Sequence, residues 1–462
     1  MSIANLLILL AVLSGLAYYF TYTRSLAIAK PLGGIRHLHS LPVYYGLRGA
    51  IWCGLPALAL LLIWMVFDEP IISSLVLSSL PEAIQPVTVA ERALTLSAIE
   101  NLALGALSSE GQDPALIRAT EYYSELKNTG QNLLTAVVLC LSVIGLAWAG
   151  TRMSAELRAR QYVEGMFRWM LLLCASIAIF TTLGILLSVI FESFRFFQTV
   201  PVTDFLFGLN WSPQTAIRAD QVGSSGSFGA IPLFVGTLLI SAVAMTVAVP
   251  LGLMSAIYLA EYASPRFRNF AKPALEILAG VPTVVYGFFA VLTVAPAIRG
   301  FGEHIGLSVS SESALAAGLV MGVMIIPFVS SLADDVIRAV PQSLRDGSLG
   351  LGATQSETIR KVVFPAALPG IVGGVLLAVS RAIGETMIVV MAAGLSAKLT
   401  VNPLEAVTTI TVQIVTLLVG DQEFDSPKTL VAFALGLMLF MVTLTLNVIA
   451  LHIVKKYREL YD

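Results

Sequence analysis

Charged side chains are scarce in this 462-residue sequence, where Asp, Glu, Lys and Arg together account for 12% of the residues. Soluble domains carry about 25% charged residues, so a soluble fold of this length is excluded. Hydrophobic residues reach 57%, and the mean hydropathy is +0.85. Lipid offers the backbone no hydrogen-bond partner, so long apolar runs indicate membrane-spanning helices. The sequence predicts an all-α, polytopic membrane protein.

Signatures of bound cofactors are also missing. The three cysteines lie in apolar runs without the spacing of metal ligands, and a free cysteine is usually a small buried hydrophobe. The Gly/Ser run at residues 223–229 lacks the GK[ST] ending of a P-loop, and His37 and His39 have no further ligand nearby. No metal, cofactor or nucleic-acid site is therefore predicted on this chain. Energy for any driven process must come from another chain or from an ion gradient.

Nine apolar runs are long enough to cross a membrane. They cover approximately residues 3–22, 46–67, 132–151, 168–191, 232–260, 274–298, 313–333, 367–394 and 428–453. No basic residue precedes the first run, whereas a cleavable signal peptide begins with a positively charged region. We therefore expect the first run to be retained as a helix.

Basic residues alternate between the connecting segments. Five segments hold 18 of the 27 lysines and arginines, and the intervening ones hold eight. Because positively charged loops stay in the cytoplasm, the five are predicted to be cytoplasmic, with the N-terminus outside and the C-terminus inside. The longest external segment, residues 68–131, has nine acidic and three basic residues. It is predicted to be helical between Pro81 and Leu107 and to form a solvated cap.

The remaining basic residue, Arg381, lies inside the eighth run, in the stretch AVSRAIGETMIVV. Thirteen helical residues beyond Leu368 place it about 20 Å into a hydrocarbon layer about 30 Å thick. Glu385 follows four residues later, so on a continuous helix the two side chains share one face and can pair. A purely structural ion pair is the alternative, although paired charges in lipid seldom stabilise better than packed leucines. A guanidinium binds tetrahedral oxyanions through two parallel bonds, which favours a pathway for an anion such as phosphate.

The predicted cytoplasmic stretch DGSLGLGATQSETIRKVVFPAALPG, residues 346–370, matches the spacing of the EAA loop of ABC importer permeases, a short helix that lies in a groove of the ATPase subunit. The matching positions are Asp346, Gly347, Ser348, Gly352, Val362, Phe364 and Pro365. Gly352 suits an elbow between helices because glycine tolerates positive φ. Ser356, Glu357 and Thr358 are expected to cap the next helix. An ordinary amphipathic helix at the membrane interface is the alternative.

Together with the stretches at residues 260–290 and 381–387, this loop resembles the permease subunits of phosphate-specific ABC importers of the PstC type, over residues 168–462. The resemblance implies a type I permease core of six helices in the bacterial plasma (inner) membrane, preceded by an extension, residues 1–151, with three transmembrane helices. It implies as partners a second, homologous permease of the PstA type, two ATPase subunits that bind ATP and an external phosphate-binding protein. Arg381 and Glu385 match residues linked to phosphate passage in that family.

A second matching stretch is interpreted as the architecture of a pore helix. Its residues are Gly280, Pro282, Tyr286 and Gly287, and Pro282 is expected to kink the sixth run. The predicted function is import of inorganic phosphate by alternating access, driven by the separate ATPase, with Glu385 as the resting partner of Arg381. The alternatives are a permease for sulfate or molybdate and, from another class, an ion-driven carrier without an ATPase.

Overall fold

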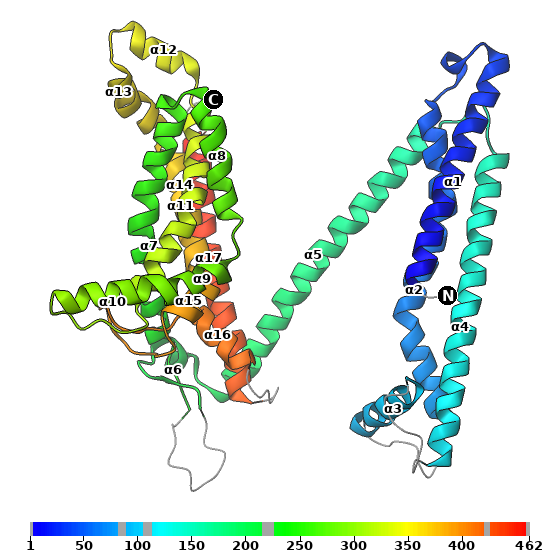
Figure 1. Cartoon of the computed structure of the whole chain (residues 1–462), viewed down its shortest axis with the longest axis horizontal. Coiled ribbons are helices and arrows are strands. Elements are labelled where there is room, and N and C mark those ends of the chain that lie inside the picture. Colours follow the sequence, from blue (N-terminus) through cyan, green and yellow to red (C-terminus); the bar gives the residue numbers. More distant parts are fainter. Residues whose placement is uncertain (1–2, 82–88, 105–112, 215–225, 420–425, 459–462) are drawn as a thin grey trace. The chain divides into compact units, whose positions relative to one another are not determined.

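The computed structural model describes residues 3–81, 89–104, 113–214, 226–419 and 426–458 (Figure 1). Helices dominate these ranges, and their two strands, β1 (Trp211–Ser212) and β2 (Ser227–Phe228), pair antiparallel. The predicted all-α class is confirmed. The chain divides into two compact units, Met1–Ile179 (unit 1) and Phe180–Asp462 (unit 2). The sequence-based division at residues 151 and 168 stays a prediction.

Nine helical segments of these ranges are long and apolar enough to cross a membrane, which is the number predicted. They are Ile3–Leu32, Pro42–Ser78, Pro114–Thr151, Ala159–Thr199, Ile231–Tyr262, Thr283–His304, Ala314–Ala339, Gln355–Ile383 and Pro427–Lys456. The sixth and eighth segments differ from the predicted runs because the helix is interrupted inside each run, at residues 280–282 and 384–386.

Unit 1 is built on three long helices, α1 (Ile3–Ala29), α2 (Pro42–Ser78) and α4 (Pro114–Thr151), which pack along one another. Their shared core consists of Leu6, Leu10, Ala57, Leu61, Leu134 and Val138. Backbones approach closely where a glycine faces the neighbouring helix. A Cβ on Gly145 of α4 would lie 2.0 Å from the carbonyl oxygen of Trp52 in α2. Such small residues allow the close contacts that associate helices in lipid.

Shorter elements complete unit 1. The 3₁₀ turns η1 (Lys30–Leu32) and η2 (Ile35–His37) connect α1 to α2. Helix α3 (Val89–Ala103) packs on α4 and accounts for the described part of the helix predicted between Pro81 and Leu107; residues 82–88 and 105–107 lie outside the described ranges. Helix α5 (Ala159–Thr199) begins in unit 1 and continues into unit 2.

In unit 2, α7 (Ile231–Ile257) packs along α11 (Ala314–Ala339), and α14 (Phe364–Ile383) contacts both α11 and α17 (Pro427–Arg458) (Figure 1). These four helices form the bundle of unit 2. The strands β1 and β2 follow the short helix α6 (Val202–Phe207). The predicted loop at residues 223–229 lies partly outside the described ranges, and its described part contains β2.

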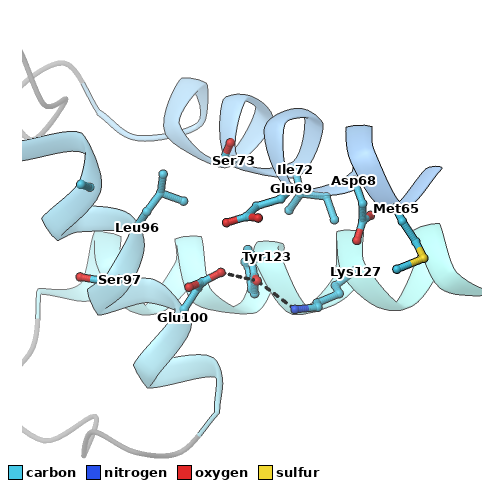
Figure 2. A pocket seen from close by; sticks show the side chains of 11 residues that line it. Met65, Asp68, Glu69, Ile72, Ser73, Leu96, Ser97, Glu100, Tyr123 and Lys127 are labelled. Atoms are coloured by element: carbon cyan, nitrogen blue, oxygen red, sulfur yellow. Dashed lines mark hydrogen bonds between the residues drawn. The ribbon is translucent and has the colours of Figure 1, made fainter. Parts of the chain in front are cut away.

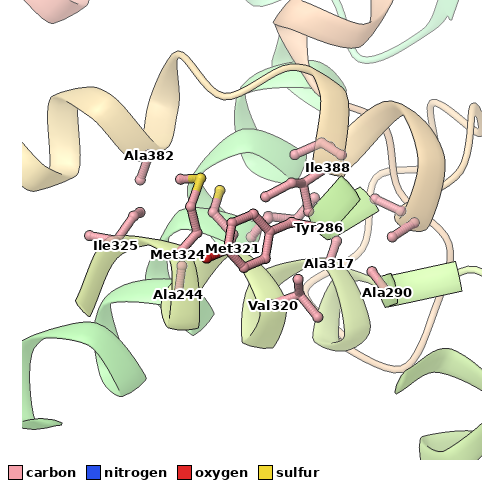
Figure 3. Packing of buried hydrophobic residues seen from close by; sticks show 14 of the residues in the cluster. Ala244, Tyr286, Ala290, Ala317, Val320, Met321, Met324, Ile325, Ala382 and Ile388 are labelled. Atoms are coloured by element: carbon pink, nitrogen blue, oxygen red, sulfur yellow. The ribbon is translucent and has the colours of Figure 1, made fainter. Parts of the chain in front are cut away.

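The apolar core of this bundle surrounds α11. Figure 3 shows the ring of Tyr286 among Met321, Met324 and Ile388. Tyr286 belongs to α9 (Thr283–Phe289) and Ile388 to α15 (Met387–Ala392), whereas both methionines belong to α11. The core therefore holds two short helices against one long one.

The sixth predicted run, residues 274–298, is not a single kinked helix. Helix α8 (Pro265–Ala279) ends before Pro282, and α9 begins after it; the π-helical turn η4 (Ala290–Val294) and α10 (Ala295–His304) follow. Proline lacks an N–H and holds the preceding residue out of the helical region, so the helix breaks instead of bending. Helix α10 lies across the direction of α11 in Figure 1.

The eighth predicted run, residues 367–394, is also wrong as a continuous helix. Helix α14 ends at Ile383, residues 384–386 are not helical, and α15 then begins at Met387. Glycine is a poor helix former, so Gly384 weakens the helix at this point. After α15 the chain is not helical again until α16 (Ile410–Val419). Non-helical backbone at membrane depth persists only where protein or a water-filled cavity supplies hydrogen bonds.

Candidate translocation site and coupling loop

Arg381 lies in the last turn of α14, and its side chain is exposed on unit 2. The guanidinium carbon Cζ is 5.5 Å from the ring centroid of Phe328 on α11, a cation–π distance. Among the described residues, no carboxylate or carbonyl accepts a hydrogen bond from this guanidinium. Its donors are therefore available to a ligand or to another chain.

Glu385 lies on the link between α14 and α15. Its half-buried carboxylate accepts a hydrogen bond from the backbone N–H of Ile388 through Oε1, at 3.5 Å. No ion pair joins Glu385 to Arg381 within the described ranges. The predicted pair is absent because the helix that would align residues four apart ends at Ile383.

Buried threonines hold this link, and no sequence motif had predicted them as site residues. The Thr411 hydroxyl donates to the backbone carbonyl of Glu385 at 2.8 Å and lies 3.0 Å from the Thr409 hydroxyl. The Thr237 hydroxyl of α7 accepts from the backbone N–H of Ile410 at 3.2 Å. The available signal was the run TTITVQ at residues 408–413, which places polar side chains at the start of an apolar helix.

The residues interpreted as pore-helix architecture surround the break between α8 and α9. Gly280 follows the last residue of α8, and Pro282 precedes the first residue of α9. The Tyr286 hydroxyl donates to the carbonyl of Leu278 at 2.9 Å, which ties the two helices together across the break. A Cβ on Gly287 would lie 2.7 Å from Sδ of Met391, so this glycine lets α9 contact α15.

The predicted coupling loop forms two short helices, α12 (Gln342–Gly350) and α13 (Gln355–Thr358), followed by the π-helical turn η5 (Ile359–Val363). Gly352 has a φ of +86°, as expected for the elbow. The N-cap is Thr354 and not Ser356: its hydroxyl accepts from the Glu357 N–H, and the Glu357 side chain accepts from the Thr354 N–H. This reciprocal capping box starts α13, which corrects the predicted position of the cap.

Hydrogen bonds of Arg345 and Gln355 fix the base of this loop. Both Nε and Nη2 of Arg345 donate to Oε1 of Glu261, at 3.3 and 3.1 Å, and Nη2 also donates to the carbonyl of Ile337 at 2.7 Å. Glu261 belongs to the π-helical turn η3 (Tyr258–Tyr262) after α7, and its carbonyl accepts from Nε2 of Gln355 at 2.7 Å. The loop is therefore tied to the ends of α7 and α11.

The other predicted loop residues occupy two environments. Asp346 and Gly347 are exposed on α12, where the Asp346 carboxylate accepts from Gln342 at 3.0 Å, and Pro365 is exposed at the start of α14. Ser348 is half-buried, and its Oγ lies 2.9 Å from Oγ1 of Thr358. At the other end of the loop, Val362 and Phe364 are half-buried, and Phe364 packs on the core at the end of the bundle.

Three cations surround Asp334, which lies on α11 six residues beyond Phe328. Asp334 is buried, and its carboxylate contacts Nη2 of Arg268 at 3.1 Å, Nζ of Lys272 at 2.9 Å and Nε of Arg338 at 3.3 Å. Arg268 and Lys272 belong to α8. The cluster therefore joins α8 to α11, and no sequence motif had predicted Asp334 as part of it.

Unit 1 contains a separate cleft of about 580 Å³ between α2, α3 and α4 (Figure 2). Asp68, Glu69 and Glu100 line it together with Lys127. The Tyr123 hydroxyl donates to Oε1 of Glu100 at 3.0 Å and accepts from Nζ of Lys127 at 3.1 Å. Carboxylates of the predicted acidic cap therefore gather in this cleft.

Two known families match this chain. The family described as "Phosphate ATP-binding cassette transporter" matches residues 7–113, within unit 1. The family described as "Binding-protein-dependent transport system inner membrane component" matches residues 248–459, within unit 2. The helical fold and these matches define the class: an ABC transporter permease, which is a multi-pass inner-membrane subunit and not an enzyme.

Curated relatives narrow the class. The probable ABC transporter permease protein YqgH of Bacillus subtilis is 33% identical over 288 residues, covering 62% of this chain and 87% of the relative. The phosphate transport system permease protein PstC of Mesorhizobium japonicum is 33% identical, covering 53% and 76%. PstC of Haemophilus influenzae is 30% identical, covering 64% and 95%. The chain belongs to the PstC family of ABC transporter permeases. Membership implies a partner permease, an ATPase on which ATP acts, and a substrate-binding protein.

Proposed function

We propose that this chain is the permease subunit of an ATP-driven importer of inorganic phosphate and that it forms the translocation path with a second, homologous permease of the PstA type. Two ATPase subunits and an external phosphate-binding protein complete the proposed complex. The observation that carries the proposal is Arg381: a permanent cation in an apolar run, exposed on unit 2 and bonded to no described acceptor. Intramembrane charges usually serve a pathway or a partner.

In the proposed step, phosphate oxygens accept hydrogen bonds from the Arg381 guanidinium while the anion passes. Phosphate carries between one and two negative charges near neutral pH, so the second permease has to supply further positive charge. Glu385 lies nearby in the chain but is not paired with Arg381 in this structure. We propose that its negative charge keeps the anion from binding too tightly, because conduction requires a site that releases as well as binds.

The coupling loop is the proposed contact with the ATPase, with α12 in the groove of that subunit. Movement of α12 would reach α7 and α11 through Arg345, which is bonded to Glu261 and to the carbonyl of Ile337. The end of α17 lies at the same end of unit 2 as α12 (Figure 1). This shared end supports a cytoplasmic C-terminus, and with nine crossings the N-terminus lies outside.

Phosphate uptake by cells carrying Arg381→Ala tests the translocation site. We expect uptake to fall at least about tenfold at normal membrane abundance, since hydrogen bonds to a charged group contribute about 1.5–3 kcal/mol. Arg299→Ala removes an exposed arginine of α10 and serves as the matched control. Undiminished uptake in Arg381→Ala would refute the role of this residue. Sulfate uptake in the wild type, or its competition with phosphate, would favour the alternative permease for another tetrahedral oxyanion.

Co-purification of the ATPase tests the coupling loop. Neither Gly350 nor Gly352 has an atom within 4 Å of an added Cβ, but only Gly352 has positive φ. An Ala at position 352 is strained by about 1–2 kcal/mol, so Gly352→Ala should reduce recovery of the ATPase roughly fivefold or more, whereas Gly350→Ala should not. Equal recovery in the two variants would show that the elbow does not position the loop. Complete absence of an ATPase in the wild type would favour the ion-driven carrier.

A further inference from the structure

A buried arginine in unit 1 has no anionic partner among the residues that the structure describes. Arg48 of α2 is only 8% exposed. Within the described ranges, no carboxylate pairs with it and no oxygen accepts a hydrogen bond from it. In the described part of the chain, the ring of Tyr162 makes a cation–π contact with Arg48, with its centroid 5.7 Å from Cζ. Glu164, which is close in sequence to Tyr162, is engaged by Arg160 at 2.6 Å.

Further donors line the same region. The ring of Tyr162 stacks on that of Trp52 at 6.0 Å, and Trp52 contacts Trp148 at 6.1 Å. The indole Nε1 of Trp52 is buried and has no hydrogen-bond partner. At the far end of this aromatic row, Cζ of Arg152 lies 4.4 Å over the ring of Trp148. Among the described residues, the side-chain donors of Arg48, Arg152 and Trp52 thus have no acceptor, and of the two arginines only Arg152 is exposed.

This arrangement is unfavourable unless an anion completes it. A guanidinium has five donors, and burying a charge without a hydrogen-bonded partner is expensive. Cation–π contact with Tyr162 recovers only part of that free energy. Arginines at helix ends commonly extend to the membrane interface to stay hydrated, whereas only 8% of Arg48 is exposed. A buried indole N–H is likewise usually bonded, so both orphan groups indicate a missing acceptor.

We propose that Arg48, Trp52 and Arg152 form a binding site for a phosphate oxyanion. Planar guanidinium groups match phosphate oxygens, and the indole N–H supplies a third donor. The oxyanion belongs either to the headgroup of an acidic phospholipid or to free inorganic phosphate. Basic pockets between transmembrane helices bind acidic headgroups, and the alternation of basic segments predicts that this end of unit 1 is cytoplasmic. The site is distinct from Arg381, which lies in unit 2.

A titration of the purified full-length chain in uncharged detergent tests the site. The probes are short-chain phosphatidylglycerol, short-chain phosphatidylcholine and inorganic phosphate, and the readout is the apparent Kd from the shift of the melting temperature. Arg48→Gln should raise the apparent Kd for the binding probe at least about tenfold. Trp52→Phe keeps one aromatic ring but removes the N–H together with part of the indole, so a rise of about fivefold is expected. Arg158→Gln, an exposed arginine of the same end, is the matched control.

The probes distinguish the two sources. Saturable binding of phosphatidylglycerol that inorganic phosphate does not displace assigns the site to a lipid headgroup, and binding of inorganic phosphate alone assigns it to the free anion. If Arg48→Gln does not fold, Trp52→Phe still decides the question. The proposal is overturned if all three probes bind wild type and the foldable variants equally, or if phosphatidylcholine binds as well as phosphatidylglycerol. Neither result bears on uptake through Arg381.

Discussion

Arg48 in unit 1 and Arg381 in unit 2 have similar contacts but differ in solvent exposure. Each faces one aromatic ring, Tyr162 or Phe328, and each lacks a described anionic partner. Arg48 is buried, whereas Arg381 is exposed. A buried cation without a counterion suits a resident anion that stays bound, because release would leave the charge uncompensated. An exposed one suits an anion that arrives and leaves.

Other cations of unit 2 show that the chain can provide its own counterions. Asp334 neutralises Arg268, Lys272 and Arg338, and Glu261 neutralises Arg345. These pairs join elements, α8 to α11 and η3 to α12, so they act as structural ties. The absence of such a pair at Arg48 and Arg381 is therefore a local property and not a general shortage of acid.

The largest expected effect is the loss of stability when Asp334, which neutralises three cations, is replaced. Asp334→Asn leaves Arg268 and Arg338 without their carboxylate and Lys272 with Asp335 alone. Breaking a buried pair costs about 3–5 kcal/mol; because Lys272 and Arg338 reach solvent, we expect about 2–4 kcal/mol of lost stability. The melting temperature of the purified chain should fall by several degrees. Asp335→Asn, whose side chain is 65% exposed, is the control. Equal melting temperatures in both variants would mean that Asp334 is not a structural tie.

A smaller effect, on the affinity for the phosphate group, is expected when a carboxylate is introduced next to Arg48. Tyr162→Glu places a carboxylate near Arg48, so the site should lose most of its affinity for the external phosphate group, about tenfold. Tyr162→Gln removes the ring without adding charge and separates the two causes. The measurement is the same lipid and phosphate titration. An unchanged Kd in Tyr162→Glu would contradict the idea that a missing counterion creates the site.

The smallest expected effect concerns the link that carries Glu385. Thr411→Val removes the hydroxyl that donates to the Glu385 carbonyl, a loss of about 1 kcal/mol. We expect phosphate uptake to fall about two- to fivefold with a changed KM, and Thr411→Ser to restore it. Thr416→Val is the control because its hydroxyl bonds only within α16, to the Gln413 carbonyl. If the two valine variants transport alike, Thr411 does not position the link.

Much of the fold followed from local patterns. Apolar length predicted nine crossings, and glycine at position 352 predicted the elbow, because both depend on properties of a short segment. The continuous helices over residues 274–298 and 367–394 were wrong for a related reason. Hydropathy reports that a segment is apolar, but it does not report where the backbone leaves the helix, as it does at Pro282 and Gly384.

The class of protein, one arginine inside an apolar run and the loop typical of an ABC permease can all be read from the amino-acid sequence. Which charges are paired depends on the folded chain. Arg268 and Asp334 are 66 positions apart, and Thr411 lies 26 positions from Glu385. Hydrogen bonds and ion pairs act over a few ångströms, so their partners depend on which helices pack together. The same physics left Arg48 and Arg381 without an anionic partner among the described residues, and no local pattern could have shown it.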